Sequence, residues 1–333
     1  MKFDDTIINN QNLNTNGVLL LEQTVCACGK LMEPLDPIVV PRTPISKLDL
    51  SLYSHRGFIK GIRLFDKVKK LKYGFSTKRF GNMAFKFGEI EEVVGNRKEF
   101  IKAAGINIKN TVFMRPNHGK GIEVVDSSHK GRGAYLPGTS VGPVDALITF
   151  DKGVALGLNS ADCVPLIMTT KKADVLALVH AGRIGTDAKI AKTTIRKLVS
   201  YGVKVEDLLV GIGPAIQRNC YKLEYLETDI PYQWLPWIST VLRGGKLFVE
   251  KNNSAGKQYR VRAEKGRILV DIIGFNVAQL LKMGVKQENI DVTAVCALCL
   301  SRKSEMYSHF LSSQFKNSKL YPEGRFMSIA QLT

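Results

Sequence analysis

Two apolar runs joined by a short polar segment constrain the fold of this chain more than any other feature. The first run is VPLIMTT, residues 164–170, and the second is DVLALV, residues 174–179. The two lysines between them are compatible with a hairpin turn. Cys163 lies immediately before the first run, and His180 follows the second. If the runs pair as a hairpin, these two side chains lie at the same open end.

Strand-like and helix-like segments are mixed from about residue 71 to the C-terminus. Helical spacing predicts one helix over 96–106 with Asn96 as its N-cap, and another over 186–202 with Thr186 as its N-cap. Apolar runs predict strands over 145–150, 154–158, 207–212 and 289–299. Because the segments follow no strict βαβ rhythm, we predict a layered, mixed α/β or α+β domain.

Residues 1–70 differ from the rest of the chain. They contain a proline-spaced stretch, residues 32–48, which is typical of extended chain with turns. We therefore expect an N-terminal extension or small subdomain over 1–70 and the main domain over 71–333. The polar start is unlike a signal peptide and no apolar run reaches about eighteen residues, so we expect a cytoplasmic protein without a membrane span.

Six cysteines in 333 residues do not indicate a secreted disulfide framework, so reduced thiols are expected. Cys26 and Cys28 form a CxC pair, and Cys296 and Cys299 form a CxxC pair. The four could form a structural zinc site if the N-terminal segment folds over the C-terminal half. Unrelated reduced thiols are the alternative.

The chain is strongly basic, with 48 Lys and Arg against 30 Asp and Glu and a net charge of +18. Such a field attracts anions such as phosphates, nucleotides or nucleic acid. The basic residues are scattered, however, and the densest cluster, residues 66–72, has no interleaved aromatic residues for base stacking. The pattern favours small anionic substrates over nucleic acid.

His118 is a third candidate beside Cys163 and His180, because it also precedes a glycine and a strand-like run. Two histidines and one cysteine suit a catalytic zinc site whose fourth position holds water, which zinc makes acidic enough to supply hydroxide near neutral pH. Asp162, next to Cys163, could orient or deprotonate a nucleophile. The gaps of 45 and 17 residues match no compact zinc motif, so Cys163 could equally be a buried small residue.

Several segments, in order along the chain, resemble one family. SADCVPLIM (160–168) and ALVHAGRIGT (177–186) resemble the ADC and HAGWRG signatures of the multicopper polyphenol oxidoreductase (laccase-like) family, in the purine nucleoside phosphorylase group related to bacterial YfiH and YlmD. Further segments of similar sequence are YGFSTKRFG (73–81), NHGKGIEVVD (117–126), GIGPAIQRNCYKL (211–223) and EGRFMSIAQL (323–332). The resemblance covers residues 71–333.

The resemblance implies a layered α/β/β/α sandwich with mixed sheets. It implies one zinc ion, bound by His118, Cys163 and His180. The implied reaction is phosphorolysis of adenosine, inosine, guanosine or methylthioadenosine, with adenosine deamination beside it. Copper-dependent phenol oxidation is also ascribed to the family, but two histidines and one cysteine are too few ligands for a multicopper cluster, so we rank it lower.

The chain departs from the family pattern at several positions. HAGRIG replaces HAGWRG, so the arginine stands at 183, and YSHF (307–310) lacks the closing arginine. We take Asp162 and Cys163 as candidate catalytic residues, with Arg183, Arg325 and Asn117 as candidates for substrate or phosphate binding. Two other classes stay open: a Cys/His-dependent amidase or peptidoglycan-precursor hydrolase, and a basic binding protein that has lost catalysis.

Overall fold

The computed structural model describes residues 6–9, 57–228, 237–240, 246–251, 259–263, 266–293, 295–316 and 318–333. The chain divides into two compact units, each considered by itself. The larger unit comprises Thr43–Ile216 and Gln279–Thr333, and the smaller unit comprises Met1–Arg42 and Gln217–Ala278. No helix in the described ranges is both long and apolar enough to cross a membrane.

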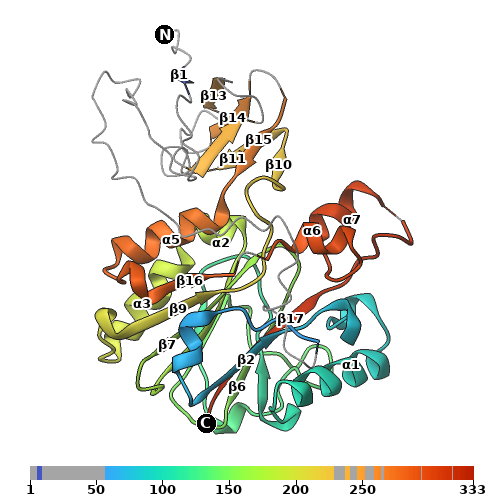
Figure 1. Ribbon diagram of the computed structural model, residues 1–333, viewed down its shortest axis with the longest axis vertical. Coiled ribbons are helices and arrows are strands. Elements are labelled where there is room, and N and C mark those ends of the chain that lie inside the picture. Colours follow the sequence, from blue (N-terminus) through green and yellow to red (C-terminus); the bar gives the residue numbers. More distant parts are fainter. Residues whose placement is uncertain are drawn as a thin grey trace. The chain divides into compact units, whose positions relative to one another are not determined.

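The larger unit contains a six-stranded mixed sheet, of which β16, β9 and β7 are labelled in Figure 1. Its central strands pair antiparallel, and the pairs at its two edges are parallel. The order is β16 (Ile290–Val292), β9 (Leu208–Ile212), β7 (Val164–Thr170), β8 (Leu176–Ala181), β5 (Ala146–Thr149) and β4 (Ile122–Val124). Every residue of β7 and β8 is buried, as their apolar sequences require. The predicted hairpin is confirmed.

A four-stranded sheet faces the six-stranded one. Its order is β2 (Leu71–Phe75), β17 (Phe326–Leu332), β6 (Ala155–Ser160) and β3 (Thr111–Phe113). Side chains of both sheets share one buried core, which includes Ile167 and Leu178 of the first sheet and Leu156 and Phe326 of the second. The burial of this apolar area between two sheets is the main stabilising contribution to the unit.

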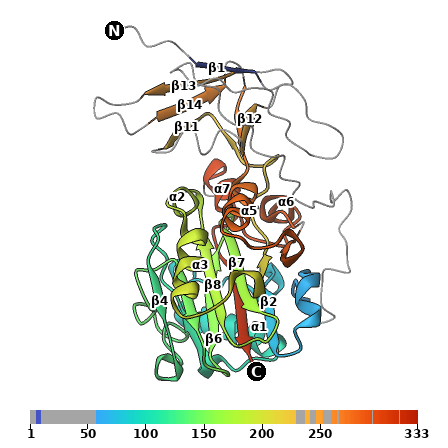
Figure 2. The same cartoon turned by 90° about the vertical axis from the view of Figure 1, so that its left-hand side faces the viewer.

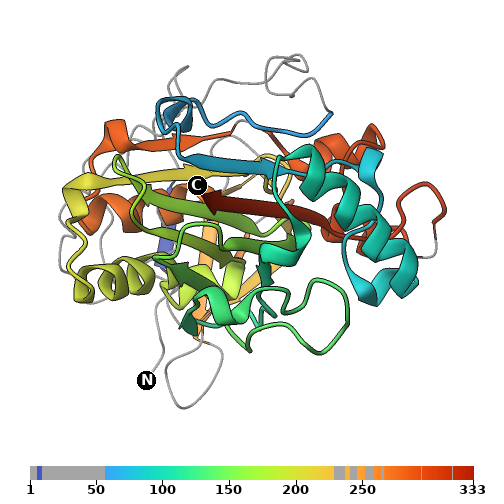
Figure 3. The same ribbon diagram turned by 90° about the horizontal axis from the view of Figure 1, so that it is seen from below.

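Helices cover the outer faces of both sheets. Phe100 and Ile101 of α1 (Ile90–Ala103) pack with Phe113 and Met327 of the four-stranded sheet. Helix α3 (Ile190–Ser200) contacts β8 of the other sheet (Figure 2). Seen from below, α1 and α3 lie on opposite sides of the strands (Figure 3). This α/β/β/α layering confirms the predicted fold class.

The described part of the smaller unit contains two antiparallel sheets and the first part of α5 (Ile272–Lys282). One contains β1 (Thr6–Asn9), β13 (Lys246–Lys251), β14 (Tyr259–Ala263) and β11 (Tyr225–Thr228). The other contains β10 (Lys222–Leu223), β15 (Ile268–Val270) and β12 (Ile238–Thr240). Pairing of β1 with β13 joins the start of the chain to a segment more than two hundred residues later.

The helix predicted over 96–106 begins earlier than expected. Helix α1 starts at Ile90, with Glu91 and Glu92 in its first turn, where carboxylates favour the positive end of the helix dipole. Asn96 lies inside the helix, and its side-chain amide donates to the Asn82 carbonyl at 3.0 Å. Its predicted role as the N-cap is therefore wrong. Gly105, with a φ of 73°, follows the end of the helix as predicted.

The helix predicted over 186–202 is two helices. Helix α2 (Arg183–Asp187) begins directly after Gly182, and Thr186 lies inside it, so Thr186 is not the N-cap. The left-handed backbone of Lys189, with a φ of 65°, separates α2 from α3. Gly202, with a φ of 85°, ends the second helix region as predicted. Sequence spacing did not reveal this break because a left-handed lysine has no compositional signature.

The C-terminal third contains further helices. They are α5 (Ile272–Lys282), α6 (Ala297–Arg302) and α7 (His309–Gln314). Cys296 is the N-cap residue of α6, and the Ala297 N–H donates to the Ala215 carbonyl at 3.0 Å. The strand predicted over 289–299 is therefore correct only for β16, and the CxxC segment belongs to a helix.

Residues ahead of β2 belong to the core of the larger unit. Ile59, Ile62 and Phe65 are buried among residues of both sheets, although they precede residue 71, where we expected the main domain to begin. We predict that Ile62→Ala lowers the free energy of unfolding by about 2–5 kcal/mol, because it leaves a cavity in a closed core.

Urea denaturation measures this change. Lys67→Ala removes an exposed side chain from the same segment and should change the free energy of unfolding by less than about 0.5 kcal/mol. Equal, small effects of the two substitutions would contradict a structural role for residues 57–68.

Candidate metal centre

The pairing register of β7 and β8 brings Cys163 and His180 together. Pro165 lies directly opposite His180 in the antiparallel ladder. Cys163 is two residues before Pro165, so its side chain lies on the same face of the hairpin as that of His180. Both side chains stand at the end of the strands, as the sequence predicted.

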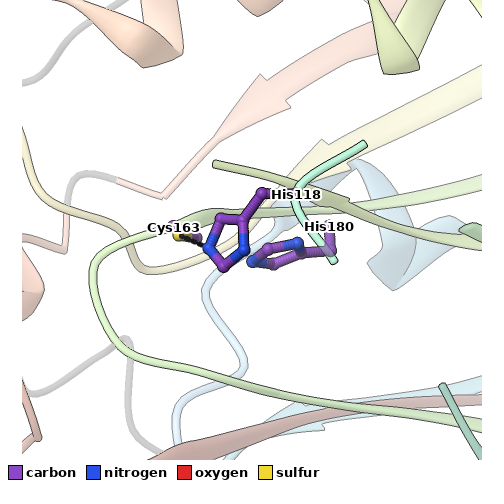
Figure 4. A group of neighbouring side chains, drawn as sticks. All are labelled: His118, Cys163 and His180. Carbon is purple, nitrogen blue, oxygen red and sulfur yellow. Dashed lines mark hydrogen bonds between the residues drawn. The ribbon is translucent and has the colours of Figure 1, made fainter. Parts of the chain in front are cut away.

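His118 reaches the same point from the loop that precedes β4 (Figure 4). Its Nε2 lies 3.8 Å from the Cys163 Sγ, and its ring meets the His180 ring edge-on, with centroids 4.8 Å apart. The possible ligand atoms of all three residues lie within 4.8 Å of one another. The structure therefore brings together the three residues that the sequence singled out.

Gly182 leaves the space that this arrangement needs. A Cβ atom at this position would lie 2.9 Å from the Cys163 Sγ and 2.9 Å from the His118 Cδ2. Its φ of −71° is one that any residue can adopt, so the requirement for glycine is one of space and not of backbone conformation.

Thiol and imidazole stabilise each other's charged forms. Burial alone would raise the pKa of Cys163, but the positive charge of His180 and hydrogen bonds from both histidines lower it to about 6. Burial likewise opposes protonation of His180, yet the Cys163 thiolate and Asp145 raise the pKa of His180 to about 9. When no metal ion is bound, these shifts favour a thiolate–imidazolium pair.

Asp145 is a member of the site that our sequence analysis missed. It is fully buried, and its Oδ1 lies 2.8 Å from His180 Nδ1. Burial raises the pKa of Asp145, but the hydrogen bonds from His180 and Gly119 outweigh it, and the pKa lies below its usual value. The available signal was an aspartate placed directly before the apolar residues of the predicted strand that became β5, where a buried charge needs a specific partner.

Asp162 is buried beside Cys163 in a left-handed conformation, with a φ of 77°. Its Oδ2 accepts hydrogen bonds from the Ser308 hydroxyl at 3.0 Å and the Phe310 N–H at 2.7 Å. Its Oδ1 is buried and has no hydrogen-bond partner among the described residues. Burial raises the pKa of Asp162 to about 7, although the two hydrogen bonds oppose the shift. The YSHF segment (307–310) thus holds Asp162.

The candidate substrate-binding residues have different surroundings. Arg183 is the first residue of α2, three positions after His180, and Asn117 is exposed in the loop of His118. The Arg325 guanidinium forms an ion pair with Glu323 at 2.9 Å and lies over the Phe87 ring.

Among the cysteines proposed for a structural zinc site, Cys296 is the N-cap of α6 and Cys299 lies in its first turn. Cys26 and Cys28 fall outside the described residues, so this prediction stays untested.

The donor set fits a single zinc ion. Tetrahedral ligands at about 2.0–2.3 Å from zinc are separated from one another by roughly 3.3–3.8 Å. The 3.8 Å Cys163–His118 distance lies at the upper end of this range, and all three ligand atoms lie within 4.8 Å of one another. One sulfur and two nitrogen ligands leave the fourth position for water or substrate. These three residues alone cannot hold the several copper ions of a multicopper cluster.

Comparison with known proteins relates the chain to enzymes of nucleoside chemistry. The family model described as multi-copper polyphenol oxidoreductase laccase matches residues 68–333. Adenosine deaminase RL5, from an unknown prokaryotic organism, is 26% identical over 59% of this chain and 68% of its own length. Purine nucleoside phosphorylase YlmD of Geobacillus stearothermophilus is 29% identical over 68% of this chain and 77% of its own length.

Solved structures share the fold. The hypothetical protein YfiH of Bacillus licheniformis superimposes with a TM-score of 0.67 at 22% identity, over 84% of this chain and 98% of its own. YlmD of Geobacillus stearothermophilus gives a TM-score of 0.66 at 26% identity, over 84% and 97% of the two chains.

We predict that Gly182→Ala weakens metal binding about 10–100-fold, a range typical of changes just outside the ligands, because the added methyl group displaces Cys163 or His118. Competition with a chelator measures the affinity. Gly95→Ala is the matched control, because a Cβ at Gly95 in α1 meets nothing within 4 Å. Equal metal affinities of the two variants would contradict the importance of this space.

Proposed function

The chain belongs to the multi-copper polyphenol oxidoreductase laccase family, and we propose that it is a zinc-dependent purine nucleoside phosphorylase with adenosine deaminase activity as a second reaction. The observation that carries the proposal is the convergence of His118, Cys163 and His180 on one point. The names of the relatives, a purine nucleoside phosphorylase and an adenosine deaminase, support the substrate class.

A bound zinc ion would supply a Lewis acid that activates water or polarises the substrate. The substrates would be a purine nucleoside, such as adenosine, inosine, guanosine or methylthioadenosine, and phosphate. In phosphorolysis a phosphate oxygen bonds to the ribose C1′, the bond from C1′ to the purine nitrogen breaks, and the leaving base takes up a proton. In deamination water adds to the purine C6, and ammonia leaves.

The chain's own residues would divide the remaining tasks. Asp162 would transfer the proton of the reaction through Oδ1, because this carboxylate oxygen accepts no hydrogen bond from a described residue. The guanidinium of Arg183 or Arg325 would bind phosphate through paired N–H groups. Arg325 would then interact with both Glu323 and the phosphate. Asn117 would offer an amide to the substrate from the loop that carries His118.

A second candidate function is hydrolysis of an amide by Cys163 as a nucleophile. The 3.8 Å contact between its sulfur and His118 favours it, since a Cys/His pair can act without metal. Covalent trapping of Cys163 by an electrophilic substrate analogue in metal-free protein would support this function and oppose the zinc-dependent one.

Metal analysis of protein purified without added metal tests the first part of the proposal. We predict a single zinc ion per chain in the wild type and its loss in Cys163→Ala, which removes the sulfur ligand. His129→Ala is the control, because His129 pairs with exposed Asp126 on the surface and should leave the zinc content unchanged. Undiminished zinc in Cys163→Ala would show that the assigned ligands are wrong.

Turnover of adenosine, with and without phosphate, tests the second part. Adenine that forms only with phosphate indicates phosphorolysis, and inosine indicates deamination. If neither product forms, the result favours a binding protein that has lost catalysis. We predict that Asp162→Asn lowers turnover about 10²–10⁴-fold while zinc is retained.

Asparagine suits this test because its amide oxygen can accept the hydrogen bonds of Ser308 and Phe310, while its NH₂ takes the place of the unpartnered Oδ1. Full activity of Asp162→Asn would show that Asp162 does not transfer the proton.

A further inference from the structure

The Asp145 carboxylate accepts hydrogen bonds from other groups besides the His180 ring. Its Oδ1 accepts hydrogen bonds from His180 Nδ1 at 2.8 Å and from the His118 N–H at 3.0 Å. Its Oδ2 accepts from the Gly119 N–H at 2.7 Å and, more weakly, from the Asn117 N–H at 3.4 Å. One buried carboxylate therefore contacts both histidines of the metal centre, through the ring of one and the main chain of the other.

The main chain of Asp145 reinforces these contacts. Its carbonyl accepts the His180 N–H at 2.7 Å, and its N–H donates to the Gly121 carbonyl at 2.8 Å. Asp145 thus links the end of β8 to the loop over residues 117–121 by both side chain and backbone. These segments are separated by about sixty residues in sequence, and Asp145 lies between them.

The loop needs such support because His118 has a left-handed backbone, with a φ of 61°. A residue other than glycine adopts this conformation only where its surroundings compensate for the strain. Three successive N–H groups of the loop converge on one anion, an arrangement that stabilises the turn. His118 is exposed, so burial contributes little to fixing its position.

The contact with Nδ1 also decides which nitrogen of His180 faces the site. When Nδ1 donates to a carboxylate, the lone pair of a neutral imidazole resides on Nε2, and the ring is held in one orientation. Asp145 therefore acts on the position of His118 and on both the position and the tautomer of His180.

We propose that Asp145 is a positioning residue that holds both histidines in place before a metal ion binds, so that a change at this one carboxylate disturbs both ligands together. The inference rests on the metal centre of the proposed function and extends it to a residue that binds neither metal nor substrate.

Asparagine is the informative substitution because it has nearly the same shape. All four groups that face the carboxylate are donors, so the NH₂ of asparagine must face two of them in either orientation. Asp126→Asn is the matched control, because Asp126 also accepts from a histidine, His129 Nδ1 at 2.9 Å, but on the surface.

Metal affinity, measured by chelator competition with Zn²⁺, gives the first readout. We expect Asp145→Asn to bind Zn²⁺ about 10–100-fold more weakly than the wild type, the range for loss of a carboxylate behind a ligand, and Asp126→Asn to match the wild type. The visible spectrum of the Co²⁺-loaded variant should lose the intensity of tetrahedral coordination. A folded Asp145→Asn with wild-type affinity and spectrum would overturn the proposal.

Amide hydrogen exchange in metal-free wild-type protein gives a second readout that does not depend on a variant that folds. The amides of His118 and Gly119 should exchange slowly although their loop is exposed, because they donate to a buried carboxylate. Fast exchange at both would overturn the proposal. A wild type that binds no metal but protects these amides would instead refute the proposed metal centre and leave the role of Asp145 in the loop intact.

Discussion

The candidate site depends above all on the register in which β7 pairs with β8. A shift by one residue would turn every side chain of one strand to the opposite face, and His180 would then leave the face that carries Cys163. Burial of all residues in both strands opposes such a shift, because apolar side chains would have to be repacked on both faces of the sheet. The same apolar pairing that stabilises the fold therefore positions a thiol beside an imidazole.

Two buried aspartates beside this hairpin have opposite surroundings. Both oxygens of Asp145 accept hydrogen bonds, so the charged form is favoured and the carboxylate serves as a fixed anchor for N–H groups. In the part of the chain that the structure describes, Asp162 has hydrogen-bond partners on Oδ2 and none on Oδ1, and burial raises its pKa to about 7. Asp145 is thus suited to positioning and Asp162 to proton transfer, because more hydrogen-bond donors surround the carboxylate of Asp145.

Local sequence patterns predicted the hairpin, its open end and the layered class of fold, because these depend on apolar runs and their order. His118 was predicted from its glycine neighbour and from the resemblance to a family, because no sequence periodicity connects it with Cys163 and His180. The role of Asp145 depends on contacts to residues 26–35 positions away along the chain. The left-handed conformations of His118, Asp162 and Lys189 are too uncommon for their residue types to be predicted from local sequence. Helix starts at Asn96 and Thr186 were predicted wrongly because tertiary contacts and a backbone break outweighed the local capping preference.

X-ray absorption spectroscopy of the zinc-loaded protein tests the central claim most directly, because it reports the ligand atoms themselves. We expect one sulfur scatterer at about 2.3 Å and nitrogen or oxygen scatterers at about 2.0–2.1 Å, with imidazole multiple scattering from two histidines. A zinc environment of four sulfur atoms, or one without sulfur, would contradict the assignment of His118, Cys163 and His180 as the metal centre.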